Sequence, residues 1–138
     1  MSNQYSMKIY PAGRGREVYR NIEICGSSTL NQLCQVILES FDFIDEHLYE
    51  FCMDNRMYSE HAYQSDPEGD EPSADITLDE VGLCKGQKFA LHYDFGDDWM
   101  FTITVSKISE VQEDFEPCVI KSKGTVQQYP DWDEDDFD

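Results

Sequence analysis

The stretch that decides the fold is KFALHYDFGDDWMFTITV, residues 88–105. Two runs of alternating residues flank the Gly-Asp-Asp segment at 96–98, an arrangement typical of two antiparallel strands joined by a tight turn. One side of the first strand carries Phe89, Leu91, Tyr93 and Phe95. Trp99 opens the matching alternation in the second strand, so we expect a core residue there rather than an exposed stacking platform.

Upstream of this hairpin, the sequence predicts a second hairpin and one main helix. Residues 5–10 and 17–24 are β-prone, and a loop with two glycines and a proline separates them. Apolar residues then recur at helical spacing over residues 30–41. Thr29 and Gln32 have the spacing of a capping box. A single apolar stripe means one buried face, so the helix is expected to lie on a sheet.

The remaining elements complete the predicted fold. Residues 47–53 read as a buried strand, and residues 77–82 as a short helical turn that ends at a glycine. The predicted order is β-β-α-β-(short helix)-β-β. We therefore expect an α+β domain with a mixed or antiparallel sheet and one main amphipathic helix across it, for which a β-grasp-like arrangement is one form. The domain is predicted to span residues 3–122, followed by an acidic C-terminal tail at 123–138.

Charge is the outlying feature of the composition. Ten Lys and Arg face 29 Asp and Glu, which gives a formal net charge of −19. Such a chain repels phosphate backbones and anionic bilayers, so direct nucleic-acid binding by a basic surface and membrane association are not expected. There is no apolar run long enough to cross a bilayer and no hydrophobic signal region near the N-terminus, which predicts a cytoplasmic protein. Five scattered cysteines without C-x-x-C spacing are expected to be free and structural.

Three segments carry a resemblance to a known family. Residues 93–99 read Y-D-F-G-D-D-W and resemble the Y-D-F-G-D-x-W hallmark of the plasmid pRiA4b ORF-3-like family. Val18-Tyr19-Arg20 is similar to the family's W-R-R strand. Residues 29–41, followed by H-L-Y-E-F at 47–51, resemble its T-L-x-x-L-H helix and H-L-H-E-F strand. The resemblance covers most of residues 5–105.

The family pattern is incomplete in this chain. The family commonly has His two residues after the Trp, where Phe101 stands here, and Tyr49 replaces the second His of H-L-H-E-F. Any family chemistry that runs through those histidines is therefore lost at least in part. Beyond Pro117 only traces of the family's final segment remain. The resemblance implies occurrence in plasmids, transposable elements and many bacterial and archaeal genomes, and a biochemical activity that is unassigned.

The strongest candidates for chemistry surround the predicted turn. Asp94, Asp97 and Asp98 lie close to one another in sequence, and His92 precedes them on the same predicted strand face as Asp94. Three close carboxylates repel each other, which raises one pKa or recruits a cation. With His47, the group could form an acid/base pair or a hard-cation site. Turn formation by the aspartates is the favoured alternative. No cofactor is expected beyond weak association of a divalent cation at the three aspartates.

The acidic surface suggests a binding function instead. The C-terminal tail combines five carboxylates with two large aromatics in the segment Asp131, Trp132, Asp133, Glu134, Asp135, Asp136 and Phe137. We expect a non-enzymatic module that uses these residues to dock on a basic protein partner. One alternative is a metal-dependent hydrolase or nucleic-acid-processing enzyme that uses Asp94, Asp97, Asp98 and His92. A second alternative is a DNA mimic that inhibits a DNA-binding protein. The oligomeric state stays open.

Overall fold

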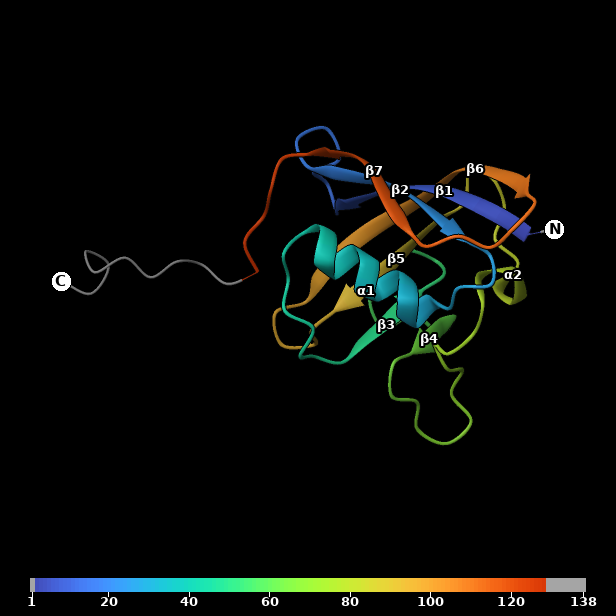
Figure 1. The fold of residues 1–138 in the computed structure, drawn as a ribbon. Coiled ribbons are helices and arrows are strands. Elements are labelled where there is room, and N and C mark those ends of the chain that lie inside the picture. Colours follow the sequence, from blue (N-terminus) through green and yellow to red (C-terminus); the bar gives the residue numbers. More distant parts are fainter. Residues whose placement is uncertain (1, 129–138) are drawn as a thin grey trace.

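The computed structural model describes residues 2–128, and its main element is a seven-stranded sheet (Figure 1). In sheet order the strands are β4 (Ala62–Gln64), β3 (Tyr49–Cys52), β5 (Lys88–Tyr93), β6 (Trp99–Val111), β1 (Ser2–Pro11), β2 (Tyr19–Cys25) and β7 (Cys118–Lys123). Two helices accompany them, α1 (Leu30–Ser40) and α2 (Leu78–Val81). Every ladder between neighbouring strands is antiparallel.

The predicted fold class is wrong. The helices supply only 11 and 4 residues, so the chain is predominantly an antiparallel β protein rather than an α+β domain. Antiparallel pairing throughout also overturns the mixed-sheet and β-grasp-like forms. The prediction missed β4 and β7, which are the two edge strands. β4 has only three residues and all six residues of β7 are exposed, so neither shows the apolar alternation that identifies a strand in sequence.

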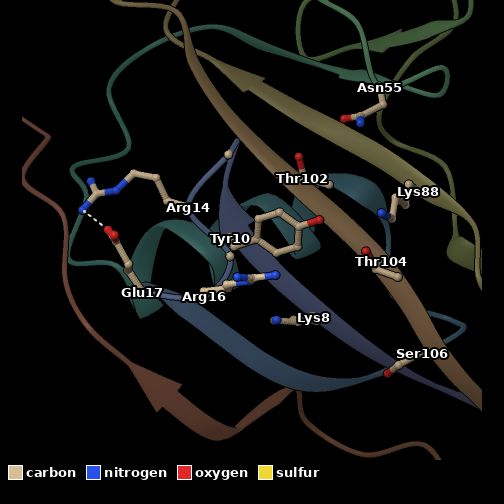
Figure 2. Close-up of a pocket in the computed structure, with 12 residues that line it drawn as sticks. Lys8, Tyr10, Arg14, Arg16, Glu17, Asn55, Lys88, Thr102, Thr104 and Ser106 are labelled. Carbon is tan, nitrogen blue, oxygen red and sulfur yellow. Dashed lines mark ion pairs between the residues drawn. The ribbon is translucent and has the colours of Figure 1, made fainter.

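The two faces of the sheet differ in character. Figure 2 looks at the face turned away from α1, where Lys8 and Tyr10 of β1 stand beside Thr102 and Thr104 of β6. Side chains alternate along a strand, so the residues between these must point to the other face. The face without a helix is therefore polar.

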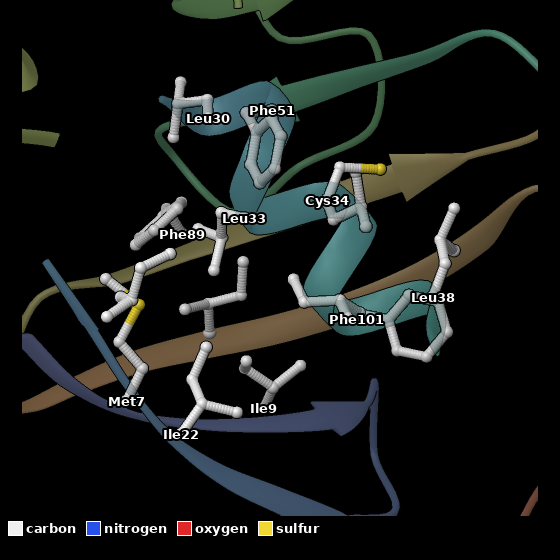
Figure 3. Close-up of a cluster of buried hydrophobic side chains, with 14 of the residues drawn as sticks. Met7, Ile9, Ile22, Leu30, Leu33, Cys34, Leu38, Phe51, Phe89 and Phe101 are labelled. Carbon is white, nitrogen blue, oxygen red and sulfur yellow. The ribbon is translucent and has the colours of Figure 1, made fainter. Parts of the chain in front are cut away.

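The other face carries the hydrophobic core. Figure 3 shows Met7 and Ile9 from the sheet together with Phe101, all packed under the apolar side of α1. Leu33 and Leu38 of α1 are fully or almost fully buried against them. Helix and sheet thus meet through one continuous apolar layer.

Local hydrogen bonds set both ends of α1. The N–H of Gln32 donates to Thr29 Oγ1 at 3.1 Å and the N–H of Thr29 donates to Gln32 Oε1 at 2.8 Å, which confirms the predicted capping box. At the other end, buried Arg20 donates from Nε to the carbonyl of Ser40 at 2.7 Å. Its guanidinium also lies 4.3 Å from the centre of the Phe41 ring. A cation at this position interacts favourably with the helix dipole.

The segment after α1 is held from two sides. The Tyr93 hydroxyl donates to the carbonyl of Ile44 at 2.5 Å and accepts from the N–H of Glu46 at 2.9 Å. The side chain of Gln128 is buried, and its Oε1 accepts from the N–H of Ile44 at 2.6 Å. The last described residues therefore still contact the sheet domain. The predicted tail residues 129–138 lie outside the described part of the chain.

Two further features bear on the predictions. The cysteines are free, as expected, and three of them, Cys25, Cys34 and Cys52, are buried. Among residues 2–128, neither helix has the length and apolar character that crossing a bilayer requires.

Candidate functional site

The turn after β5 uses Asp94 as a structural residue. Asp94 is buried and has a φ of 66°, a left-handed conformation that Asp adopts more readily than most residues. Its Oδ1 accepts from the N–H of Gly96 at 3.0 Å and from the N–H of Asp97 at 3.3 Å. The N–H of Asp98 donates to the carbonyl of Asp94 at 2.6 Å. This carboxylate therefore stabilises the turn.

The turn separates four of the five predicted candidates into two pairs, and exposed Asp97 belongs to neither. Strand β5 ends at Tyr93, and the positive φ of Asp94 takes its side chain away from His92. Asp94 Oδ2 instead lies 3.4 Å from Nε2 of His47. Asp98 Oδ1 lies 2.6 Å from Nε2 of His92. Of the three aspartates, Asp98 is thus the one that reaches His92.

The left-handed conformation of Asp94 also changes the side on which Phe95 lies. The alternation of residues 88–95 predicts Phe95 on the same face as Tyr93. In the structure its ring instead lies next to that of His92, with 5.0 Å between the ring centres.

Trp99 is half-buried, packing edge-on against Phe43 at 4.8 Å between ring centres. It borders the core as expected, without being fully enclosed.

Glu50 completes a partly buried cluster that the sequence did not reveal. The register of β3 and β5 pairs Glu50 with His92, and Glu50 Oε2 lies 2.7 Å from His92 Nδ1. The same carboxylate accepts from the N–H of Tyr58 at 2.8 Å and from Nε2 of Gln64 at 3.0 Å. A charged residue inside the apolar run 47–53 was the available signal, because buried charges in proteins are paired.

The cluster consists of a histidine between two carboxylates. Glu50, His92 and Asp98 form it, and we call it the histidine cluster. An ionised carboxylate only accepts hydrogen bonds, so both ring nitrogens must donate when both carboxylates are ionised. His92 thus lies between two carboxylates, and among residues 2–128 every buried side-chain nitrogen and oxygen has a hydrogen-bond partner.

Burial and hydrogen bonding act in opposite directions on Glu50. Desolvation raises its pKa, but the hydrogen bonds from His92, Gln64 and the Tyr58 N–H outweigh that effect and hold the pKa below its usual value. The folded cluster therefore favours the ionised carboxylate.

Only one end of the histidine cluster reaches solvent. His92 is fully buried and the ring of Tyr58 covers it edge-on at 4.9 Å, whereas the side chain of Asp98 is 41% exposed. Asp98 lines a hollow of about 450 Å³ together with Arg14, Met57 and Trp99. A molecule in this hollow would meet the Asp98 carboxylate, with His92 behind it.

The structure also indicates which side chains could share a metal ion. Within residues 2–128, the group whose ligand atoms lie close together is Glu50, Cys52 and His92, rather than the three aspartates. Burial raises the pKa of Cys52 to about 12, which opposes the thiolate form that binds a metal. As it stands, the histidine cluster can hold and orient protons.

The tail candidates, residues 131–137, lie outside the described residues.

Fold and site together define a small, strongly acidic antiparallel-sheet protein with a partly buried carboxylate–histidine–carboxylate cluster. The chain belongs to the plasmid pRiA4b ORF-3-like protein family, whose model matches residues 3–133. A similar solved structure is that of a protein of unknown function from Methanosarcina mazei Go1. It is 25% identical and superposes with a TM-score of 0.70, over 88% of this chain and 70% of the other. No match was found among curated proteins. The family's biochemical function is thus unassigned.

Proposed function

We propose that the protein is a non-enzymatic binding module that docks on a basic protein partner. The observation that carries this proposal is an exposed apolar pair among carboxylates. Ile44 and Leu48 are 56% and 52% exposed, and the exposed acids Asp42, Asp45 and Glu46 lie between and beside them in the chain. We call these five residues the docking patch.

The docking patch is held in place before any partner arrives. The backbone of Ile44 is hydrogen-bonded to the side chains of Tyr93 and Gln128, and the N–H of Glu46 donates a hydrogen bond to the Tyr93 hydroxyl. A segment that is already ordered loses little conformational entropy on binding. The exposure of two aliphatic side chains on a fixed backbone supports a recognition role.

Gln128, the last described residue of the predicted tail 123–138, lies next to this patch. Gln128 contacts Ile44, and Asp131 follows three residues later, which is at most about 11 Å of chain. The five carboxylates of residues 131–136, with Trp132 and Phe137, follow Gln128 in the sequence, and in this proposal they add to the docking patch. An apolar centre with a polar, solvent-accessible rim is the usual arrangement of a protein–protein interface, and tryptophan is among the residues enriched at its hot spots.

Electrostatics supports a basic partner. A net charge of −19 attracts a cationic surface over long distances and accelerates encounter, most strongly at low salt. The enzyme alternative draws less support from the geometry, because both ring nitrogens of His92 already contact carboxylates and Asp94 serves the turn.

The experiment is affinity capture from the native host at low and at high salt, with bound proteins identified by mass spectrometry. We expect a basic protein that is retained at low salt and released at high salt. The double substitution Ile44→Ser/Leu48→Ser should reduce capture about tenfold, as expected when hot-spot residues are lost. The matched control Val119→Ser/Ile120→Ser changes another exposed apolar pair, on β7, and should leave capture unchanged.

Deletion of residues 129–138 tests the tail separately. We expect slower association with the captured protein and a weaker dependence on salt, with dissociation less affected. Equal capture by the wild type and by both the patch and tail variants would refute the docking function. Competition by duplex DNA for the same captured protein would instead identify the DNA-mimic form of the hypothesis.

A further inference from the structure

A second concave site lies on the face of the sheet that carries no helix. It is a groove of about 730 Å³, and Figure 2 shows the side chains that line it. Its floor is formed by Tyr10 of β1 and by Thr102 and Thr104 of β6. None of its lining residues belongs to the docking patch, so this site is independent of the proposed docking function.

The groove is basic although the protein is acidic. Four of the chain's ten basic residues line it, namely Lys8, Arg14, Arg16 and Lys88, against the single acid Glu17. Glu17 forms an ion pair with Arg14, with 3.5 Å between Glu17 Oε2 and Arg14 Nη2. Within residues 2–128, no carboxylate forms an ion pair with the other three cations.

Aromatic rings take the place of carboxylates around Lys8. Its Nζ lies 4.8 Å from the centre of the Tyr19 ring and 5.5 Å from that of Tyr10. These contacts orient the ammonium group without neutralising its charge. In Figure 2 the guanidinium of Arg16 lies beside Tyr10 on the same side of the groove as Lys8. Like charges held together in this way favour a bound anion.

Neutral donors accompany the cations. The hydroxyls of Thr102, Thr104 and Ser106 follow one another at alternate positions along β6, and Asn55 stands on the opposite wall. Hydroxyl and amide groups donate hydrogen bonds to phosphoryl oxygens, while lysine and arginine supply the charge. Together these groups match a ligand with several anionic oxygens.

Size and charge together select the ligand class. A cavity of several hundred Å³ suits a small molecule. A long polyanion such as nucleic acid would extend beyond the groove over a protein of net charge −19, where it is repelled. We propose that this groove binds a small molecule that carries a di- or triphosphate group.

The test is isothermal titration of the full chain with tripolyphosphate and with ATP, and with adenosine as the uncharged control. We expect one site for each phosphate compound, weakened by salt, and no heat from adenosine. The double substitution Lys8→Gln/Lys88→Gln should weaken binding at least about tenfold, since each charge-assisted contact is worth roughly that factor. The control Lys85→Gln/Lys107→Gln removes the same charge outside the groove and should change affinity less than about twofold.

Several results would overturn the proposal. Equal weakening by both double variants would show that only net charge matters. Tighter binding of single-stranded oligothymidylate than of tripolyphosphate would identify a nucleic-acid groove. Binding of tripolyphosphate only after deletion of residues 129–138 would show that the chain's own acidic segment is the occupant. The Lys8→Arg variant, which keeps the charge, should retain binding and thereby separates loss of charge from damage to the fold.

Discussion

Replacing Glu50 with alanine tests the histidine cluster most directly. The change deletes a carboxylate that is almost fully buried and removes its contacts with His92, Tyr58 and Gln64. His92 Nε2 retains its hydrogen bond with Asp98, but His92 Nδ1 loses its partner. The perturbation therefore leaves a buried polar atom unsatisfied and opens a small cavity.

The magnitude follows from these contacts. Each hydrogen bond to a charged group contributes about 1.5–3 kcal/mol, but such contributions are not additive. The N–H of Tyr58 belongs to an exposed residue and can bond to water, so the lost pairing with His92 dominates. Breaking a buried ion pair by removing one partner costs about 3–5 kcal/mol, and we expect a loss of unfolding free energy of that size.

The assay is equilibrium urea unfolding at neutral and acidic pH, with the wild type and the variant side by side. The pKa of Glu50 is lower in the folded protein than the usual 4.5, so its stabilisation is present above that value and is lost as pH falls below it. The difference between wild type and Glu50→Ala should therefore shrink below about pH 4.5.

A matched control is Glu60→Ala, which removes an exposed acid from the segment that follows β3 and should change stability by less than about 0.5 kcal/mol. A loss under about 1 kcal/mol for Glu50→Ala, or a difference that stays constant through the acidic range, would refute the reasoning.

Three further predictions concern other parts of the domain. Trp99→Ala should cost about 3 kcal/mol in urea unfolding, at the low end for a buried aromatic because the ring is only partly buried, and a loss under about 1 kcal/mol would mark an exposed platform. Calorimetric titration with Mg²⁺, Mn²⁺, Ca²⁺ and Zn²⁺ should show only weak binding, because the raised pKa of Cys52 opposes the thiolate that zinc prefers and the three aspartates that could hold the harder cations are not grouped. Tight zinc binding abolished by Cys52→Ser would contradict this. Thr29→Ala should cost about 1 kcal/mol by removing the helix cap, and an unchanged thermal midpoint would show that packing alone sets the start of α1.

The candidate site could be predicted only in part. His92 and Asp98 were found because they flank a turn that is visible in the local pattern. Glu50 was not found as their partner, because it lies 42 residues from His92 and the contact depends on the register between β3 and β5. The placement of Asp94 was missed because one left-handed φ reverses the side of the strand to which a side chain points.

The basic groove was hidden for a related reason. Net charge is a sum over the chain and says nothing about where the few basic residues gather. Lys8 and Lys88 stand 80 positions apart in the sequence, and both come to the groove because β1 and β5 each pair with β6.

The sequence by itself determined the features that depend on neighbours along the chain. These are the alternation of the 88–105 hairpin, the cap at Thr29, the excess of acid and the family signature at 93–99. The tertiary structure alone decided the fold class, the histidine cluster and the groove. Each of these depends on backbone hydrogen bonds between distant strands, and edge strands such as β7 are defined by those bonds and not by burial of their side chains.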